Sequence, residues 1–388
     1  MKISARHYET GEPIQVTIHG KTISRIDPIW PETDISDLPW IAPGFFDLQI
    51  NGHMGKWFAN PALTPEDVIE ISERHFSFGI TRLCPTLITS SHQSLIAGFT
   101  AIRQACEQES WLDEMVPGCH LEGPYLSGED GPRGAHPIEH IRPADWSEFE
   151  TLQEASGNRI CLVTIAPEVE GAIDFIKRAV DSGVVIAIGH TAAMPEQIEE
   201  AIEAGATLST HLGNGAHGTI RRHPNYIWSQ LGSSKLYASL ITDTHHIPPE
   251  FVRTVIKTKT PLRTIITCDA SGWAGCKPGI YGDENTSVEV LENGPIVVAG
   301  QRQLLAGSGQ MTDKCVAEAI DMADLTLSEG IHMATLNPSK LLGFEEIRLK
   351  RGSRADLMLF KYSGSAESFR VETTLLAGEV RFGAIESP

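Results

Sequence analysis

The stretch ICLVTIAPEVEGAIDFIKRAVDSGVVIAIGH, residues 160–190, decides the fold class of this chain. Two apolar runs, Ile160–Pro167 and Val184–His190, enclose a segment, Val169–Ser182, that has the pattern of an amphipathic helix. Near-continuous apolar strands separated by helices indicate a parallel sheet that is buried on both faces. The stretch is therefore expected to form one strand–helix–strand unit.

The same alternation continues along the middle of the chain. Helix-like segments such as Pro65–Phe78 and Pro249–Lys259 begin with Pro, a common start signal of helices. Eight units over about 230 residues match the repeat number and size of an α/β fold, the (β/α)8 or TIM barrel. A doubly wound open sheet is the alternative, but it usually carries a glycine-rich phosphate-binding fingerprint that this chain lacks. The expected strands are Gly44–Asn51, Ile80–Thr89, Met115–Glu122, Ile160–Pro167, Val184–His190, Ala206–His211, Leu236–Asp243 and Thr264–Asp269.

The two ends of the chain differ from its middle. Both read as short alternating strands with turn residues, and each alone has too little core to be stable. We predict that residues 1–42 and 344–388 pair into one small β-sandwich domain and that residues 43–343 form the barrel. The Gly-rich region 273–310 has little helix signal and is expected to be an extended loop near the last strand, where long loops are usually functional.

The composition excludes several classes of protein. The chain has 388 residues, of which 41% are hydrophobic and 21% are charged, so it is expected to fold rather than stay disordered. A net charge of −19 excludes a general nucleic-acid binder. No apolar run reaches the ~18 residues of a membrane span, and the first residues lack the apolar core of a signal peptide. Seven scattered cysteines favour reduced thiols, so we expect a cytoplasmic protein.

Chemically active side chains gather where the expected strands end. In a barrel, the carboxyl ends of all strands face one pocket. A lone His at a strand end is usually a hydrogen-bonded turn or core residue, but five strands that each deliver such a group predict a metal site. The residues are His120 and Glu122, His190, His211, Asp243 with His245 and His246, and Asp269.

One carboxylate and two imidazoles, from Glu122, His190 and His211, would leave at least one coordination position open for water. This set suits one catalytic Zn²⁺ or another divalent transition ion such as Fe²⁺, Mn²⁺ or Co²⁺. A bound ion lowers the pKa of its water toward ~7 and polarises a carbonyl. Asp269 would then take a proton from the water and deliver it to the leaving group.

A series of motifs runs in order through nearly the whole chain. They are PGFFDLQINGHMG (43–55), HLEGPYLS (120–127), GAH (134–136), GHT (189–191), THLGN (210–214), DTHH (243–246), CDA with AG (268–275), LAGS (305–308), NPSKLLG (337–343) and RGSRADL (351–357). In these motifs the chain resembles the N-acetylglucosamine-6-phosphate deacetylase family of the amidohydrolase superfamily.

The resemblance implies a (β/α)8 barrel with a β-sandwich built from both termini, and a homodimer. It implies hydrolysis of the acetamido group of a phosphorylated amino sugar, first of all N-acetylglucosamine-6-phosphate, to acetate and the free amine. Glu122, His190 and His211 correspond to the metal ligands, and Asp269 corresponds to the catalytic acid and base. His246 would stabilise the oxyanion. Substrate contacts correspond to Ala135, His136, Asn214, Gly215, Arg222, His246, Leu305, Ala306 and Gly307.

The first expected strand bears on the number of metal ions. Many amidohydrolases carry His-x-His there and bind a second ion, whereas this chain has the neutral amides Gln49 and Asn51. Amides are poor ligands for Zn²⁺, so we predict a single metal ion per subunit.

The expected substrate region departs from the commoner family pattern, with Gly215-Ala216-His217 after Asn214 and with two arginines, Arg221 and Arg222, before His223. Because Arg binds phosphate through two parallel hydrogen bonds, the cationic segment is a candidate phosphate clamp. For Arg221 a solvated surface position is the preferred alternative. These departures leave the exact acyl sugar open.

Five further side chains lie next to the expected site. A strand alternates its sides, so Cys119 and Cys268 should point away from the pocket as core residues. His53 and His120 could each reach the pocket. Trp273 could close over a substrate or pack on the barrel rim.

Two other functions stay open at this point. One is an amidohydrolase for another N-acyl compound, such as N-acetylgalactosamine-6-phosphate or an unphosphorylated acyl amine. The other is a barrel that has lost catalysis and acts as a binding scaffold, although such chains tend to lose ligands and every expected metal and acid–base position is filled here.

Overall fold

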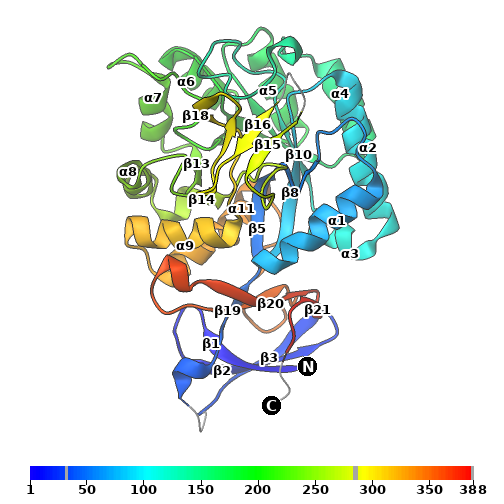
Figure 1. Cartoon of the computed structure of the whole chain (residues 1–388), viewed down its shortest axis with the longest axis vertical. Coiled ribbons are helices and arrows are strands. Elements are labelled where there is room, and N and C mark those ends of the chain that lie inside the picture. Colours follow the sequence, from blue (N-terminus) through cyan, green and yellow to red (C-terminus); the bar gives the residue numbers. More distant parts are fainter. Residues whose placement is uncertain (31–33, 283–286, 386–388) are drawn as a thin grey trace.

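Eight parallel strands close around a common axis in the computed structural model of this protein, which describes residues 1–30, 34–282 and 287–385. Neighbouring strands pair in parallel, as where Leu162 lies opposite Val185, and the spatial order around the barrel follows the order along the chain (Figure 1). The predicted (β/α)8 barrel is confirmed. Its strands are β5 (Phe45–Ile50), β8 (Ile80–Ile88), β9 (Cys119–Glu122), β10 (Ile160–Ile165), β11 (Val185–Ile188), β12 (Leu208–Ser209), β13 (Tyr237–Ile241) and β14 (Thr264–Thr267).

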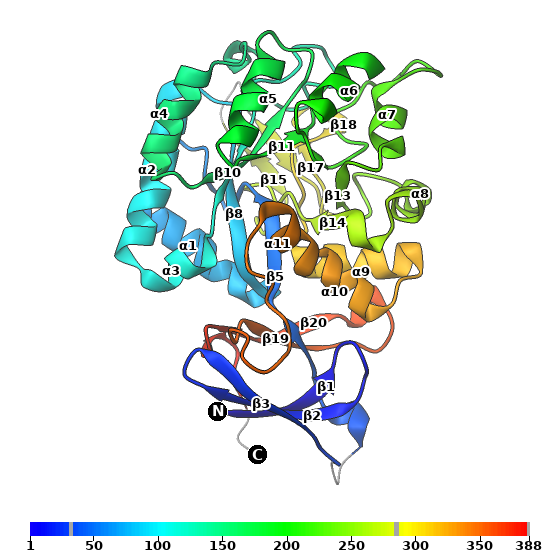
Figure 2. The same cartoon turned by 180° about the vertical axis from the view of Figure 1, so that it is seen from behind.

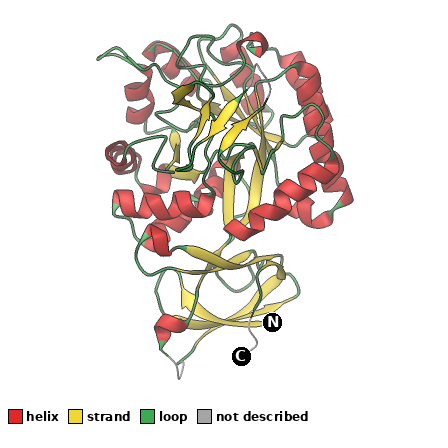
Figure 3. Cartoon of the chain, viewed as in Figure 1, coloured by secondary structure: helices red, strands yellow, loops and turns green. Residues whose placement is uncertain are grey.

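Helices cover the outside of the barrel (Figure 3). The first begins where the Thr64 hydroxyl accepts the N–H of Asp67 and Pro65 occupies the first turn, as the start signals predict. No helix in the described residues is long and apolar enough to cross a membrane. The helices are α1 (Pro65–His75), α2 (His92–Gln108), α3 (Ser110–Met115), α4 (Trp146–Ser156), α5 (Ala172–Asp181), α6 (Pro195–Glu203), α7 (Tyr226–Gly232), α8 (Pro249–Lys259), α9 (Thr312–Ala323), α10 (Leu327–Met333) and α11 (Leu336–Leu342).

The interior of the barrel is filled at its amino end. Leu341 and Leu342 of α11 pack against a buried apolar layer, so this end is sealed (Figure 2). The open end is therefore the carboxyl end of the strands, where barrel enzymes place their sites. The layer consists of Leu48, Leu162, Ala187, Leu208 and Ile265.

Strands from both chain ends join in one sheet below the barrel (Figures 1 and 2). In it β4 pairs with β1 on one side and with β19 on the other, so the predicted pairing of the two termini is confirmed. The Thr374 hydroxyl donates to the carbonyl of Phe76 at 2.7 Å, which ties the sheet to the barrel. The domain limits at 42/43 and 343/344 stay a prediction. The strands are β1 (Lys2–His7), β2 (Pro13–His19), β3 (Thr22–Pro28), β4 (Trp40–Pro43), β19 (Leu357–Lys361), β20 (Arg370–Leu376) and β21 (Glu379–Phe382).

The expectation of an extended loop over 273–310 is wrong. The described part of this region holds a four-stranded antiparallel sheet that lies beside the barrel mouth (Figure 1). Its strands are mostly three residues long and separated by turns that contain Gly294 and Gly300, so no alternating pattern is long enough to read. The strands are β15 (Gly279–Tyr281), β16 (Val288–Val290), β17 (Ile296–Val298) and β18 (Gln301–Leu305), and a separate hairpin follows β5 as β6 (Gly52–His53) and β7 (Lys56–Trp57).

Two of the expected strands are shorter than predicted by four residues each. The strand expected over Met115–Glu122 begins only at Cys119, because Met115 is buried as the last residue of α3. The strand expected over Ala206–His211 is reduced to Leu208–Ser209. Apolar side chains at a helix end and at a strand start cannot be told apart by pattern alone.

Candidate active site

Four buried side chains meet at the open end of the barrel. The Nε2 atom of His211 lies 3.0 Å from Oε1 of Glu122, and Nε2 of His190 lies 3.4 Å from the same oxygen. The Nε2 atoms of His190 and His211 are 3.1 Å apart, and Nε2 of His136 is 3.2 Å from that of His190. Ligand atoms around a tetrahedral ion with bonds of ~2.0 Å are separated by roughly 3.3 Å. These contacts therefore have the spacing of a metal site.

The protonation of His190 supports a cation at this point. Its Nδ1 lies 2.9 Å from the carbonyl oxygen of Pro132, and a carbonyl only accepts, so Nδ1 carries a proton and the neutral form of the ring turns the lone pair of Nε2 toward the cluster. A bare nitrogen beside two imidazoles and a carboxylate oxygen suits a positive ion. Nδ1 of His211 is buried without a partner among the described residues, so it is available to carry that ring's proton.

The chain turns sharply where it delivers these groups. His190, His211 and Asp269, each close to the end of a strand, have positive φ angles of 50°, 28° and 50°. Such backbone is uncommon outside glycine and concentrates at functional sites. Gly215 lies against this turn, because a Cβ atom there would be 2.6 Å from Nδ1 of His190. The predicted substrate position Gly215 thus adjoins a metal-ligand candidate.

Two amides lie between the site's carboxylates. Gln49 Nε2 donates to Glu122 Oε1 at 2.8 Å and to Asp269 Oδ1 at 3.0 Å, and Asn51 Nδ2 donates to Asp269 Oδ1 at 2.7 Å. Burial raises the pKa of Asp269 to about 7, and the negative charge of Glu122 adds to the shift. A carboxyl group with this pKa can both accept and release a proton near neutral pH.

His246 is held by a second carboxylate. Its Nδ1 lies 2.7 Å from Oδ2 of Asp243, which also accepts the Ser308 hydroxyl at 2.7 Å. Burial alone would raise the pKa of Asp243, but the hydrogen bond and charge of His246 hold it well below its ordinary value. Asp243 is therefore ionised, and Nδ1 of His246 donates to it. The N–H of Ser308 donates to the carbonyl of Asp269 at 2.8 Å, which places the Leu305–Gly307 turn beside the site.

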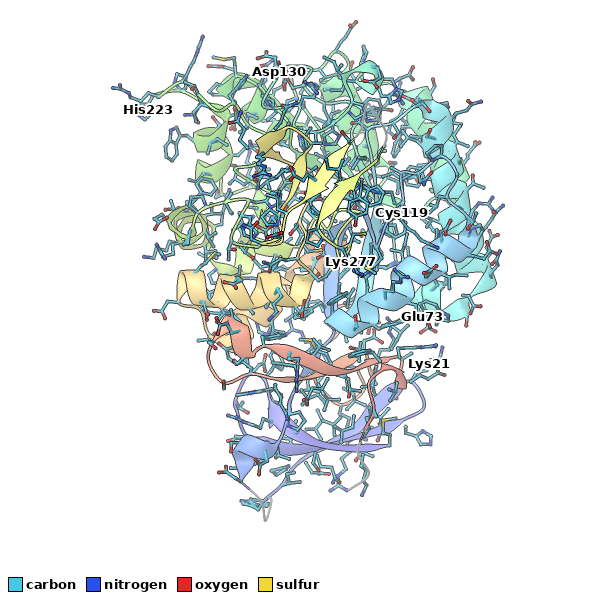
Figure 4. The ribbon with its side chains drawn as sticks, viewed as in Figure 1. Lys21, Glu73, Cys119, Asp130, His223 and Lys277 are labelled. Atoms are coloured by element: carbon cyan, nitrogen blue, oxygen red, sulfur yellow. The ribbon has the colours of Figure 1, made fainter. Side chains whose placement is uncertain are left out.

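The remaining predicted contacts divide into two groups. The Asn214 side chain donates to the carbonyl of His211 at 3.2 Å, and Ala135 is exposed directly before His136. Arg222, by contrast, is exposed next to His223, which Figure 4 shows at the tip of a loop that projects away from the barrel. The structure does not bring Arg222 to the cluster of its own chain.

Two other histidines lie outside the cluster. The His120 ring contacts the hydroxyls of Thr164 at 2.8 Å and Thr86 at 3.3 Å, so both of its nitrogens are used inside the barrel. The His53 ring packs 5.5 Å from that of His75.

The cationic segment and the aromatic residue near the last strand also have local partners. His217 contacts Glu129 at 3.1 Å. Arg221 is exposed, which agrees with the solvated surface position that the sequence favours for it. Trp273 stacks on Tyr281 of the small antiparallel sheet, with ring centroids 4.9 Å apart.

Two features of the site differ from the expectations from the sequence. Gln49 and Asn51, expected only to be poor ligands, are the donors that hold Asp269. Asp47, Gln49 and Asn51 occupy alternate positions of the expected strand Gly44–Asn51, and this pattern is the available signal. His136, expected only to contact the substrate, forms a group with Glu122 and His190 whose ligand atoms all lie within 4.8 Å of one another.

Known proteins share both the sequence pattern and the fold. The profile of the amidohydrolase family matches residues 40–381. The chain belongs to this family.

Several relatives of this amidohydrolase are named as deacetylases of phosphorylated amino sugars. The human N-acetylglucosamine-6-phosphate deacetylase is 30% identical over 88% of this chain and 83% of its own length. The N-acetylgalactosamine-6-phosphate deacetylase of Escherichia coli O157:H7 is 29% identical over 89% of each chain. The structure of an aspartate-to-alanine mutant of the Mycobacterium smegmatis N-acetyl-D-glucosamine-6-phosphate deacetylase, in complex with N-acetyl-D-glucosamine-6-phosphate, superimposes with a TM-score of 0.87 at 28% identity and covers 98% of this chain and 99% of its own. The resemblance to the deacetylase family is confirmed.

Replacing the carboxylate of the cluster tests its role as a ligand. We expect Glu122→Gln to weaken metal binding at least ~100-fold, because a neutral amide replaces the only anionic ligand of the set. Elemental analysis after dialysis against metal-free buffer measures this. Glu129→Gln is the control, since that carboxylate is exposed and contacts His217 instead. A Glu122→Gln protein that keeps its ion as firmly as the unaltered chain would contradict the assignment.

Proposed function

We propose that this amidohydrolase removes the acetyl group from N-acetylglucosamine-6-phosphate by hydrolysis, giving glucosamine-6-phosphate and acetate. The observation that carries the proposal is the cluster of Glu122, His190 and His211 beside an aspartate, Asp269, whose pKa is raised to about 7. A filled set of ligands with an adjacent acid–base group favours catalysis over a binding scaffold. The names of the relatives favour a phosphorylated amino sugar as the substrate.

Glu122, His190 and His211 would hold one divalent ion, with Zn²⁺ preferred because two imidazoles and a carboxylate are its usual catalytic ligands. When bound, the ion supplies Lewis acidity that activates water and polarises the acetamido carbonyl. The residues fit such an ion, since the lone pair of His190 Nε2 and the oxygen of Glu122 converge at 3.4 Å.

Asp269 moves the proton. Both amide contacts, from Gln49 and Asn51, fall on its Oδ1, which leaves Oδ2 to accept a proton from the attacking water. The water oxygen bonds to the carbonyl carbon, and the C–N bond then breaks. Asp269 returns the proton to the amine nitrogen, which restores its carboxylate and releases the free amine. The second proton of the water stays on the acid product, which loses it to solvent and leaves as acetate.

His246 would stabilise the negative charge that develops on the carbonyl oxygen. Its Nδ1–H is fixed on the ionised Asp243 at 2.7 Å. Donation from Nε2 to that oxygen uses the imidazolium form of the ring, whose positive charge the Asp243 carboxylate stabilises. Ser308 donates to the same carboxylate, which couples His246 to the Leu305–Gly307 turn. We assign this turn, together with Ala135, His136, Asn214 and Gly215, to the binding of the acetamido sugar.

An acetate-release assay on related sugars tests the function. We expect kcat/KM for N-acetylglucosamine-6-phosphate to exceed that for N-acetylgalactosamine-6-phosphate and for unphosphorylated N-acetylglucosamine at least tenfold. The matched control is Asp269→Asn, which should lower kcat about 1,000-fold while the metal stays bound, because proton transfer alone contributes 10²–10⁴. Failure of the unaltered protein to release acetate from any of these sugars would overturn the proposal.

We propose that the site holds a single ion. The amide groups of Gln49 and Asn51 direct N–H bonds at Asp269 and Glu122 from the side where a second ion would have to bind. Elemental analysis of protein purified without chelator should therefore find one ion per chain. The double variant Gln49→His with Asn51→His should gain a second, because imidazole is a good ligand for these metals. Two firmly held ions in the unaltered chain would contradict this proposal.

We propose that Arg222 binds the phosphate of a substrate held by a second copy of the chain. Arg222 is exposed, and the adjacent His223 lies on a projecting loop, so its own cluster is not the site that it serves (Figure 4). This arrangement fits a homodimer, and Arg matches a phosphate with two hydrogen bonds.

Subunit mixing tests the Arg222 proposal. Arg222→Met should raise KM for the phosphorylated sugar with little change in kcat. Random assembly of Arg222→Met and Asp269→Asn chains would create one intact site in each mixed dimer, so about a quarter of all sites should regain normal kinetics. If Arg222 served its own chain, mixing would restore nothing.

A further inference from the structure

Asp47 is a buried carboxylate whose two oxygens are fully engaged. It lies on β5, with no exposed surface. Its Oδ1 accepts the N–H of Gln49 at 3.0 Å and the Thr267 hydroxyl. Its Oδ2 accepts the N–H of Cys268 at 2.9 Å and the Thr312 hydroxyl at 2.6 Å. One side chain thus joins the first strand, the last strand and the start of α9.

These contacts lie at the seam where the barrel closes. β5 pairs with β8 through several backbone positions on its other side. Toward β14, the described residues supply one isolated β-bridge, between Ile50 and Ala270. The N–H of Asn51 donates to the carbonyl of Ala270 at 3.0 Å. The Asp47 carboxylate therefore holds the first and last strands together where the backbone pairing is sparse.

The same contacts fix the register between β5 and β14 at the site. Asp47 binds the backbone of Gln49 on β5 and the backbone of Cys268, which directly precedes Asp269. At this register Gln49 Nε2 reaches Asp269 Oδ1 at 3.0 Å, although the two residues are 220 positions apart in the chain. A slip of one strand along the other would separate them, since each residue advances a strand by ~3.3 Å.

We propose that Asp47 is a positioning residue for the proposed reaction: it sets the register between β5 and β14 that places Gln49 and Asn51 on Asp269. The hydrogen bonds of the Asp47 carboxylate go to Gln49, Thr267, Cys268 and Thr312, and none of these is a metal-ligand candidate. The proposal rests on the proposed function only in the choice of assay.

A carboxylate is required at this position for a chemical reason. Each oxygen receives a backbone N–H, from Gln49 on one side and from Cys268 on the other. Asn would present its NH2 group to one of these N–H groups in either orientation, and two donors cannot bond to each other. The hydroxyls of Thr267 and Thr312 can rotate to adapt, but the backbone N–H groups cannot.

Asp356 offers a matched control outside the site. It is also fully buried, and its carboxylate accepts the N–H of Ala377 at 2.8 Å and Nε of Arg354 at 2.7 Å. It adjoins β19 in the terminal sheet. Asp356→Asn therefore creates a comparable unpaired donor without reaching the first or last barrel strand.

The experiment compares Asp47→Asn and Asp356→Asn as metal-loaded full chains. Both should lower the melting temperature. For Asp47→Asn we expect kcat per folded molecule to fall at least tenfold, with KM for N-acetylglucosamine-6-phosphate within about threefold and one ion per chain retained. For Asp356→Asn, kcat should stay within twofold. Equal kcat per folded molecule in both variants would reduce Asp47 to a stability role and overturn the proposal.

A second variant covers the case in which Asp47→Asn does not fold. Thr267→Val is isosteric and suits a strand, but it removes one donor to Asp47 on the strand that leads to Asp269. It should lower kcat about threefold or more. Unchanged kcat in this variant would contradict the proposal.

A crystal structure of Thr267→Val separates this proposal from the proposed function. The structure should show the contact between Gln49 Nε2 and Asp269 Oδ1 lengthened beyond hydrogen-bond distance. This readout decides the Asp47 proposal even if the unaltered protein cleaves none of the acetamido sugars, an outcome that would refute only the proposed reaction. An unchanged contact would refute the positioning role.

Discussion

The site depends on the closure of the barrel, which the hydrogen bonds between the first and last strands hold in place. Glu122 and His211 are 89 positions apart in the chain, and they meet only because the parallel strands curve into a closed ring. The Asp47 carboxylate occupies the seam of that ring and receives four hydrogen bonds there, of which those from Thr267 and Cys268 cross the seam. Closure brings the strand ends to one rim, while α11 fills the opposite end. The chemistry is thus a consequence of topology, as in other barrel enzymes.

Electrostatics explains why the rim combines carboxylates with amides and imidazoles. Glu122 and Asp269 are both buried, and two buried carboxylates repel each other unless cations or donors intervene. Gln49 donates to both, and Asn51 donates to Asp269. Burial and the charge of Glu122 raise the pKa of Asp269 to about 7 against the hydrogen bond from Asn51, whereas a second ion in place of the amides would favour its charged form. One strand therefore influences both the metal count and the acid–base group.

The sequence predicted the barrel and the meeting of Glu122, His190 and His211, because apolar periodicity and strand ends are local signals. Other features depend on tertiary packing. The short strands between residues 279 and 305 are too brief for a periodic signal, and the positive φ angles of His190 and Asp269 have no signature in residue type. His136 reaches the cluster from a loop, whose path no pattern predicts. The position of Arg222 on a projecting loop likewise required the structure.

The most direct test of the account is anomalous diffraction from crystals of the zinc-loaded protein, recorded on both sides of the zinc absorption edge. We expect one strong peak per chain, within ~2.0–2.2 Å of a carboxylate oxygen of Glu122 and of Nε2 of His190 and His211. Asp269 should remain unbound to the ion and in contact with Gln49 and Asn51. A peak coordinated by other side chains, or no peak at the open end of the barrel, would contradict it.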